Sequence, residues 1–216
     1  MADSRLAACI DHTLLKPDAT RRELEELCSQ AGDYGFYGVC VNPSAIARVA
    51  CILEGTGVVP VCVVGFPLGA SLPETKAAEA AAVTALGARE LDMVLNIGAF
   101  KDGDDDLVHA DVAGVVRAAG GNPVKVILET ALLSGEEIVR ACRICVAAGA
   151  SFVKTSTGFG PGGATEDVVR LMRRAVGPDI GVKASGGIHT REQALAMIEA
   201  GANRIGASAS IAIVRG

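Results

Sequence analysis

SGEEIVRACRICVAAGASFVKT, residues 134–155, contains one complete unit of the pattern that decides the fold. Ser134 and Glu137 form a capping box, in which two side chains satisfy the free N–H groups at the start of a helix. The helix is expected to end at Ala148-Gly149-Ala150, because glycine readily takes the left-handed conformation that stops a helix. The short apolar run 152–155 then predicts a buried strand.

The same alternation of helix and strand recurs along the chain. Apolar, β-branched runs predict strands at residues 37–41, 58–64, 90–95, 124–128, 152–155, 180–183 and 204–206, and a weaker one at 9–13. Further capping boxes are expected at Thr20/Glu23, Ser71/Glu74 and Thr190/Gln193, and further glycine helix ends at Leu86-Gly87-Ala88 and Ala200-Gly201-Ala202. Most runs lack polar alternation, which is typical of parallel strands covered on both faces. Eight such units favour an α/β protein with one domain over residues 1–216, a single (β/α)8 TIM barrel, and disfavour an open doubly wound sheet.

Composition excludes several classes of protein. Half of the 216 residues are hydrophobic and none is Trp, so we expect an aliphatic core. A net charge of −5 argues against a nucleic-acid surface, which is usually basic. The seven cysteines lack the paired spacings of a disulfide framework or a zinc site. No signal peptide and no apolar run of about 20 residues is apparent, so we expect a cytoplasmic protein without nucleic-acid or membrane partners.

Two lysines stand inside predicted strands, where aliphatic residues are expected. Lys154 lies near the end of the run 152–155, and Lys183 lies near the end of the run 180–183. Catalytic groups of a barrel belong at the C-terminal ends of its strands. Burial and a neighbouring ammonium group both lower the pKa of a lysine, and the neutral amine attacks carbonyl groups. Lys154 is therefore the predicted Schiff-base nucleophile. The alternatives are a Lys154 that extends outward past a helix and a Lys183 that binds phosphate or pairs with a carboxylate.

Asp92 is the third ionisable residue inside a predicted strand. The period of two puts it on the same face as Val94 and Asn96. A buried carboxylate needs a charged or hydrogen-bonding partner, and the two lysines are candidates. Asp92 is then either a proton relay beside the amine or a purely structural counter-ion.

Glycine-rich loops predict an anion site. Ser185-Gly186-Gly187 follows the strand of Lys183, and Gly206-Ala207-Ser208 follows the last strand. Loops after strands 7 and 8 of a barrel frequently bind phosphate through backbone N–H groups. The run Gly158-Phe-Gly-Pro-Gly-Gly163 adds another turn rich in backbone donors. Its proline and the lack of an acidic ribose anchor argue against a dinucleotide cofactor.

The three histidines give weaker evidence about function. His12 is expected to line the barrel mouth, whereas His109 and His189 are expected on a helix face or a loop. Their spacing does not match that of metal ligands, so we expect no metal ion.

Five motifs together resemble the deoxyribose-phosphate aldolase family. They are Ile10-Asp-His-Thr-Leu-Leu15, Val64-Gly-Phe-Pro-Leu-Gly69, Leu91-Asp-Met-Val-Leu-Asn-Ile-Gly98, Phe152-Val-Lys-Thr-Ser-Thr-Gly-Phe159 and Val182-Lys-Ala-Ser-Gly-Gly-Ile188. The resemblance runs from about residue 10 to residue 208. It implies a class I aldolase that reversibly cleaves 2-deoxy-D-ribose 5-phosphate into D-glyceraldehyde 3-phosphate and acetaldehyde, in deoxyribonucleoside breakdown. It also implies that no metal or organic cofactor is needed.

The resemblance assigns roles to individual residues. Lys154 is the expected Schiff-base lysine, and Asp92 and Lys183 are the expected acid/base pair. Residues expected to bind the substrate and its phosphate are Gly158, Gly186, Gly187 and Ser208, with Asp11 and Thr13 at the sugar hydroxyls. The expected partners are a phosphorylated sugar, aldehydes and further copies of the chain in a homodimer or homotetramer.

The chain departs from the family pattern in one respect. Some members have a longer C-terminal tail that ends in tyrosine, whereas this sequence stops at Gly216 and its tyrosines are Tyr34 and Tyr37. We therefore expect water, held by Asp92 and Lys183, to carry the proton to the enamine carbon.

Two other classes of function stay open at the level of the residues. One is a sugar-phosphate isomerase or epimerase on the same fold, which would use a carboxylate, His or Cys base and no nucleophilic amine. The other is a barrel that serves as a non-enzymatic scaffold. In a scaffold, three buried ionisable groups would reduce stability without a compensating role.

Overall fold

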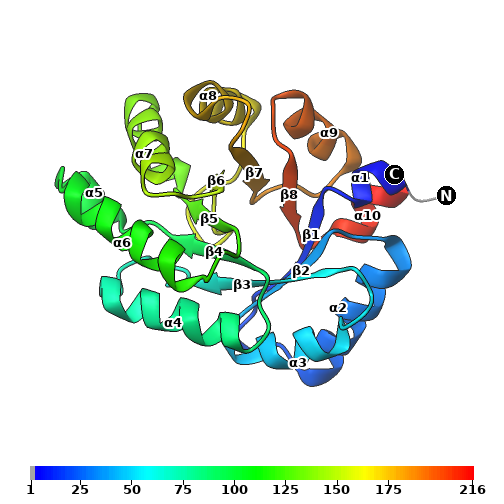
Figure 1. Cartoon of the computed structure of the whole chain (residues 1–216). Coiled ribbons are helices and arrows are strands. Elements are labelled where there is room, and N and C mark those ends of the chain that lie inside the picture. The colour runs from blue at the N-terminus through cyan, green and yellow to red at the C-terminus, as the bar shows by residue number, and fades with distance from the viewer. Residues whose placement is uncertain (1–2) are drawn as a thin grey trace.

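The computed structural model describes residues 3–216, which contain a closed barrel of eight parallel strands in chain order (Figure 1). The predicted TIM-barrel fold is thereby confirmed, although residues 1 and 2 of the predicted domain lie outside the described residues. Each predicted strand is present with bounds shifted by at most two residues. The strands are β1 (Ile10–Leu14), β2 (Gly38–Val41), β3 (Val59–Val64), β4 (Glu90–Val94), β5 (Val124–Ile127), β6 (Phe152–Lys154), β7 (Gly181–Ser185) and β8 (Arg204–Ala207).

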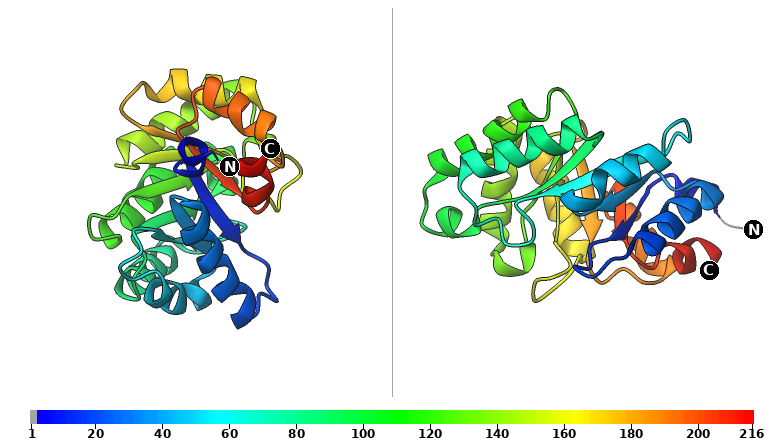
Figure 2. Two further views of the ribbon diagram at one scale, coloured as in Figure 1. Left: turned by 90° about the vertical axis from the view of Figure 1, so that its right-hand side faces the viewer. Right: turned by 90° about the horizontal axis from the view of Figure 1, so that it is seen from below.

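Helices cover the outside of the barrel, as the views in Figures 1 and 2 show. The longer ones are α2 (Arg21–Tyr34), α3 (Ile46–Ile52), α4 (Pro73–Ala85), α6 (Asp105–Ala118), α7 (Gly135–Ala147), α8 (Glu166–Val176) and α9 (Arg191–Glu199). Shorter elements are α1 (Ser4–Ala7), α5 (Ile97–Lys101), α10 (Ser210–Arg215) and the 3-10 turns η1 (Pro43–Ala45) and η2 (Thr130–Leu132). None of the helices within residues 3–216 has the length and apolar character needed to cross a membrane.

Most of the predicted helix boundaries are confirmed. The capping boxes at Thr20/Glu23, Ser134/Glu137 and Thr190/Gln193 are formed, and Gly87, Gly149 and Gly201 have φ angles of 108°, 91° and 113°. The capping box predicted at Ser71/Glu74 is wrong. Helix α4 begins at Pro73, and its N-cap is Leu72, which makes no side-chain cap. Proline suits the first helical position because its fixed φ is already helical and it has no N–H to satisfy.

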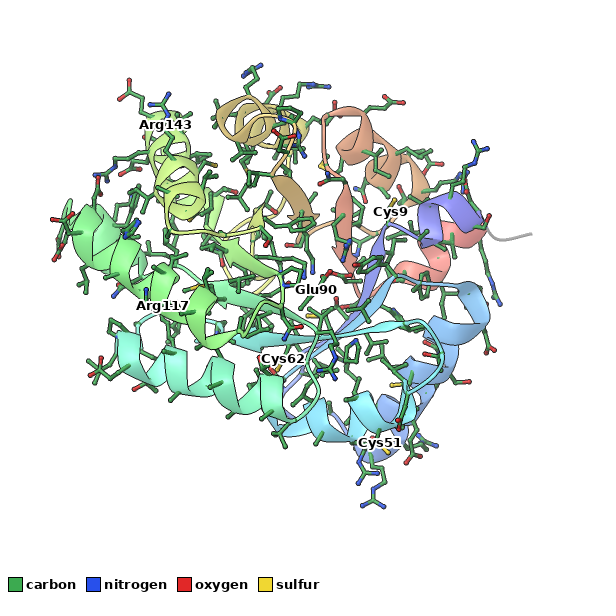
Figure 3. The ribbon with its side chains drawn as sticks, in the orientation of Figure 1. Cys9, Cys51, Cys62, Glu90, Arg117 and Arg143 are labelled. Carbon is green, nitrogen blue, oxygen red and sulfur yellow. The ribbon has the colours of Figure 1, made fainter. Side chains whose placement is uncertain are left out.

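Side chains alternate between the two faces of every strand. On β4, Leu91 and Met93 point outward and pack with the helices in the main hydrophobic core, which is largely aliphatic as expected. Glu90 and Asp92 occupy the other face of β4 and are buried. Figure 3 shows the labelled Glu90 near the centre of the ring of strands.

The barrel interior is divided into an apolar and a charged part. A small hydrophobic cluster fills the part beside β2 and β3 and consists of Leu15, Cys40, Val61 and Val63. The remaining strands contribute ionisable side chains instead. The C-terminal ends of these strands hold the site described next.

Glycines leave room for two of the large interior side chains. A Cβ atom on Gly181 would lie 2.0 Å from the ring of Phe152 on the neighbouring strand. A Cβ atom on Gly206 would lie 3.0 Å from Cε of Lys183. Close packing therefore excludes a side chain at residue 181, and the glycine at residue 206 leaves the Lys183 side chain its path across the barrel.

Candidate active site

The three residues predicted to carry the chemistry meet inside the barrel. Lys154 ends β6 and lies directly opposite Lys183 of β7 in the strand register. Oδ2 of Asp92, from β4, accepts hydrogen bonds from Nζ of Lys154 at 2.7 Å and from Nζ of Lys183 at 2.8 Å. Lys154 is only 3% exposed, and the other two are fully buried. Both lysines therefore point inward, and the outward alternative for Lys154 is wrong.

A third lysine, Lys125, also contacts Asp92, and the sequence interpretation missed it. Nζ of Lys125 on β5 lies 2.9 Å from Oδ1 of Asp92 and 2.5 Å from Oε2 of Glu90. Lys125 is fully buried and sits opposite Asp92 in the β4–β5 register. The signal was present in the sequence, because Lys125 interrupts an otherwise aliphatic run.

Arg204 on β8 links the same cluster to β1. Its guanidinium lies 3.0 Å from Oδ1 of Asp11 and 3.0 Å from Oε2 of Glu90. The other oxygen of Asp11 accepts a hydrogen bond from Lys183. The hydroxyl of Tyr37, a half-buried residue, donates to Glu90 at 2.8 Å. The interior is thus one continuous network of ion pairs.

The pKa values of the two lysines at the site move in opposite directions. Burial lowers the pKa of Lys154, and the ammonium of Lys183 lowers it further, against the opposing effect of Asp92. Burial also disfavours the charged form of Lys183, but the carboxylates of Asp11 and Asp92 outweigh it and raise the pKa of Lys183. Of the two lysines, Lys154 is therefore the one that gives up its proton more readily.

Asp92 remains ionised. Burial by itself would raise the pKa of this carboxyl, but Lys125, Lys154 and Lys183 hold it well below its usual range. The carboxylate can consequently accept hydrogen bonds from three ammonium or amine groups at once.

The charges of the whole network support a neutral Lys154. Three carboxylates face four basic groups in the interior: Asp11, Glu90 and Asp92 against Lys125, Lys154, Lys183 and Arg204. The network is electrically balanced when one base gives up its proton. Uncompensated charge is costly in a buried site, so this balance favours the neutral amine.

A cavity of about 180 Å3 opens at the C-terminal end of the strands, above Lys154. Six of the predicted site residues line it, namely Thr13, Lys154, Gly158, Gly186, Gly187 and Ser208. The φ angles of Gly186 and Gly187 are 84° and 75°, a backbone region that favours glycine. The cavity therefore joins the amine to the loops predicted to bind an anion.

Asp11 is placed differently from Thr13. Asp11 is fully buried beneath the cavity, and its two carboxylate oxygens are engaged by Lys183 and Arg204. Thr13, the next inward residue of β1, lines the cavity and donates a hydrogen bond to the backbone oxygen of Asp11 at 2.9 Å. The geometry brings Thr13, but not Asp11, to a place where a substrate hydroxyl could lie.

His109 on α6 and His189 on the loop after β7 lie where they were expected, whereas His12 does not. His12 is on the outer face of β1, with Nε2 2.9 Å from Oε1 of Gln30 and its ring against Phe36, so its predicted place at the barrel mouth is wrong. Residue 12 alternates with the inward Asp11, which decides its direction. His189 also lines the cavity, together with Ser185 of the predicted anion loop and Thr157. The sequence interpretation did not assign His189 or Thr157 to the site.

Hydrogen bonds between neighbouring loops hold the cavity in shape. The hydroxyl of Thr155 donates to the backbone oxygen of Ser185 at 2.9 Å, and the hydroxyl of Ser185 donates to the backbone oxygen of Ser156 at 2.6 Å. The carboxylate of Glu129 accepts from the hydroxyl and the N–H of Thr157. Within residues 3–216, no three His, Cys, Asp or Glu side chains are grouped so that they could hold a metal ion.

Fold and site together define a (β/α)8-barrel enzyme with a buried amine at the C-terminal end of its strands. The chain belongs to the DeoC/LacD family of aldolases, whose model matches residues 5–215. This membership disfavours the isomerase and scaffold alternatives.

Similar proteins cover nearly the whole chain. A deoxyribose-phosphate aldolase of Geobacillus sp. (strain WCH70) is 55% identical over 99% of this chain and 96% of its own length. The deoxyribose-phosphate aldolase of Bacillus subtilis (strain 168) is 56% identical over 98% of this chain and 95% of its own length. The solved structure of the tetrameric deoxyribose phosphate aldolase from Aeropyrum pernix is 35% identical, with a TM-score of 0.93, over 99% of this chain and 91% of that one.

Proposed function

We propose that this protein is an aldehyde-lyase that reversibly cleaves 2-deoxy-D-ribose 5-phosphate into D-glyceraldehyde 3-phosphate and acetaldehyde. The observation that carries the proposal is the buried amine of Lys154, which borders the cavity and lies 2.7 Å from Asp92. The names of the relatives at 55% and 56% identity support the same reaction.

The reaction begins with attack of the neutral Lys154 amine on the C1 aldehyde of the open-chain sugar. The resulting carbinolamine loses its hydroxyl as water and becomes an iminium ion. Lys183, which is charged before this step, gives the departing hydroxyl its proton and becomes neutral, and Asp92 orients both lysines and stabilises the iminium charge.

Bond cleavage follows from the electron demand of the iminium ion. The neutral Lys183 amine takes the proton of the C3 hydroxyl, the C2–C3 bond breaks, and D-glyceraldehyde 3-phosphate leaves. The electron pair of the broken bond stays on C2 and forms an enamine on Lys154. A proton is then added at C2, by water held between Asp92 and Lys183. Addition of water to the new iminium carbon releases acetaldehyde and restores the free amine.

The phosphate of the substrate is assigned to the glycine loops. Gly186 and Gly187 would present backbone N–H groups to the phosphate, with Gly158 and the hydroxyl of Ser208 at the same cavity. Thr13 would contact a sugar hydroxyl. Asp11 would act indirectly, because its carboxylate holds Lys183 in place.

Three further proposals concern the protein in its cell. The residues 1–216 form one aldolase domain, in a homodimer or homotetramer, and the tetrameric state of the Aeropyrum pernix relative supports an oligomer. The seven cysteines are free thiols, which fits a reducing cytoplasm. The reaction would serve the breakdown of deoxyribonucleosides.

Reductive trapping tests the proposed Schiff base. Incubation with acetaldehyde and borohydride should add one ethyl group, which peptide mass spectrometry maps to Lys154. Lys154→Arg should abolish the adduct because guanidinium stays protonated. Lys16→Arg, at an exposed lysine, is the matched control and should label like the wild type. An unlabelled wild type, or a label chiefly on Lys183, would overturn the assignment.

A further inference from the structure

The mechanism above makes no use of Lys125, although this side chain is fully buried beneath the reacting lysines. It comes from β5, whereas Lys154 and Lys183 come from β6 and β7. A buried ammonium group is costly unless it is paired, and Lys125 is paired with two carboxylates, Glu90 and Asp92. The second of these carboxylates is the one that Lys154 and Lys183 share, so Lys125 can act on both reacting lysines.

The two oxygens of Asp92 are divided among the lysines. Oδ1 accepts from Lys125 at 2.9 Å, whereas Oδ2 accepts from Lys154 at 2.7 Å and from Lys183 at 2.8 Å. Lys125 thus fixes the rotation of the carboxylate, so that Oδ2 faces the reacting lysine and its neighbour. Without Lys125, Oδ1 would be a buried and unpaired carboxylate oxygen.

Lys125 also supplies one of the four positive charges that face three carboxylates. The base that gives up its proton most easily is the one with the fewest carboxylate partners. Lys125, Lys183 and Arg204 each contact two carboxylates, whereas the structure pairs Lys154 with Asp92. Lys154 also borders the cavity, where a released proton can reach solvent.

We propose that Lys125 is a positioning residue for Schiff-base formation, which holds one oxygen of Asp92 and supplies the positive charge that leaves Lys154 as a neutral amine. The inference rests on the proposed role of Lys154 as the nucleophile. The inference has a specific electrostatic consequence. Removing the positive charge of Lys125 should favour the protonated form of Lys154, and removing the negative charge of Glu90 should favour the neutral form.

The groups that face these two lysines come from several strands. Lys125 contacts Glu90 and Asp92 of β4 and lies under the ring of Phe152 on β6. Lys183 of β7 and Asp11 of β1 act on its charge from a greater distance, and Arg204 of β8 lies on the far side of Glu90. Lys154 contacts Asp92, and Lys183 and Cys40 act on its charge. Burial raises the pKa of the Cys40 thiol to about 11, so this thiol stays neutral while Lys154 reacts.

The test uses two variants with opposite charge changes. Lys125→Met removes a positive charge, and Glu90→Gln removes a negative charge from the carboxylate that lies 2.5 Å from Lys125. Lys125→Arg keeps the charge and is the conservative control. The double variant Lys125→Met/Glu90→Gln keeps the net charge of the network. Circular dichroism and thermal unfolding establish which variants fold.

The readout is the rate of acetaldehyde adduct formation as a function of pH, from aliquots quenched with borohydride and weighed as intact protein. Lys125→Met should move the acidic limb of this profile upward by about one pH unit or more, because two charges within one buried network interact strongly. Glu90→Gln should move the limb downward. Lys125→Arg and the double variant should have limbs near the wild-type position.

The outcomes separate this inference from the proposed function. A wild-type label on a residue other than Lys154 would refute the proposed function. A label on Lys154 with an unshifted acidic limb in Lys125→Met would refute the inference alone, because a merely structural lysine changes rate or stability without moving the limb. If Lys125→Met does not fold, the pH profile of Glu90→Gln tests the inference instead. An acidic limb that is unshifted or moves upward in Glu90→Gln overturns the inference.

Discussion

Replacing Asp92 with Asn removes a carboxylate that three buried lysines share, with Nζ to oxygen distances of 2.7, 2.8 and 2.9 Å. The change keeps the size of the side chain and alters its charge. We expect it to destabilise the protein and to change how stability depends on pH.

The size of the effect follows from the partners that each lysine keeps. Breaking a buried ion pair by removing one partner costs about 3–5 kcal/mol. Lys125 keeps Glu90 and Lys183 keeps Asp11, whereas Lys154 loses its carboxylate but can give up its proton. We therefore expect a loss near the lower end, about 3 kcal/mol in the free energy of unfolding at neutral pH.

The dependence on pH has a definite sign. In the wild type, the pKa of Asp92 is depressed, so its stabilisation is present above the unfolded pKa of about 3.9 and is lost as pH falls through the folded pKa. In Asp92→Asn, two carboxylates face four bases, so a second base beside Lys154 should have a folded pKa below the unfolded lysine value of about 10.4. The unfolded state then binds more protons, and the stability of the variant should rise with pH relative to the wild type.

Urea unfolding followed by circular dichroism measures both quantities. The gap between wild type and Asp92→Asn should be about 3 kcal/mol near neutral pH and should narrow at about pH 9.5. Asp18→Asn, at an exposed position, is the control and should lie within about 0.5 kcal/mol of the wild type. A gap below about 1 kcal/mol, or a gap that widens as pH rises, would refute the reasoning.

Three further predictions concern catalysis and the end of the barrel. Lys183→Leu should slow turnover and move the acidic limb of the kcat/KM profile upward, since the ammonium of Lys183 lowers the pKa of Lys154; an unchanged limb would mean that the two lysines are not coupled. Gly187→Asp should raise KM for the phosphorylated sugar by like-charge repulsion while acetaldehyde trapping persists, and equal efficiency of the wild type with free deoxyribose would contradict a phosphate site. Deletion of residues 213–216, which removes the buried Ile213 and Val214, should cost about 2–5 kcal/mol of stability. The truncated protein should still exchange acetaldehyde methyl protons with deuterated solvent, as NMR can follow, and loss of exchange with an intact Lys154 adduct would assign the tail a catalytic role.

The order of the elements was predictable from the sequence because each strand is a short apolar run bounded by local signals. The capping boxes and the glycines after the helices depend on contacts within four residues, so they can be identified without the tertiary structure. The capping box predicted at Ser71/Glu74 was wrong for an equally local reason. Pro73, two residues after Ser71, is the first residue of the helix because proline is favoured at that position. The N-cap is therefore Leu72 and not Ser71.

The reacting trio was predictable because Lys154, Lys183 and Asp92 each interrupt a buried run. Lys125 interrupts a buried run in the same way and could have been identified, but the pairing of the network could not, because which side chains reach the same height depends on the stagger of the strands around the barrel. Lys125 lies opposite Asp92, a relation that the strand register creates and the linear sequence does not display. Arg204 begins its strand, and such a position is ordinarily solvated, so the sequence offered no sign of its ion pairs.

The ion pairs of Arg204 have a consequence for the nascent chain. Arg204 contacts Asp11 across 193 positions of sequence and Glu90 across 114. While the ribosome is still making the earlier strands, this guanidinium does not yet exist, and closing the barrel would bury Oδ1 of Asp11 without its partner. Leaving a buried acceptor without a hydrogen-bond partner costs about 1–3 kcal/mol. Translation of β8 therefore supplies both the last strand and the partner of this oxygen, so a shorter barrel of seven strands is disfavoured during synthesis.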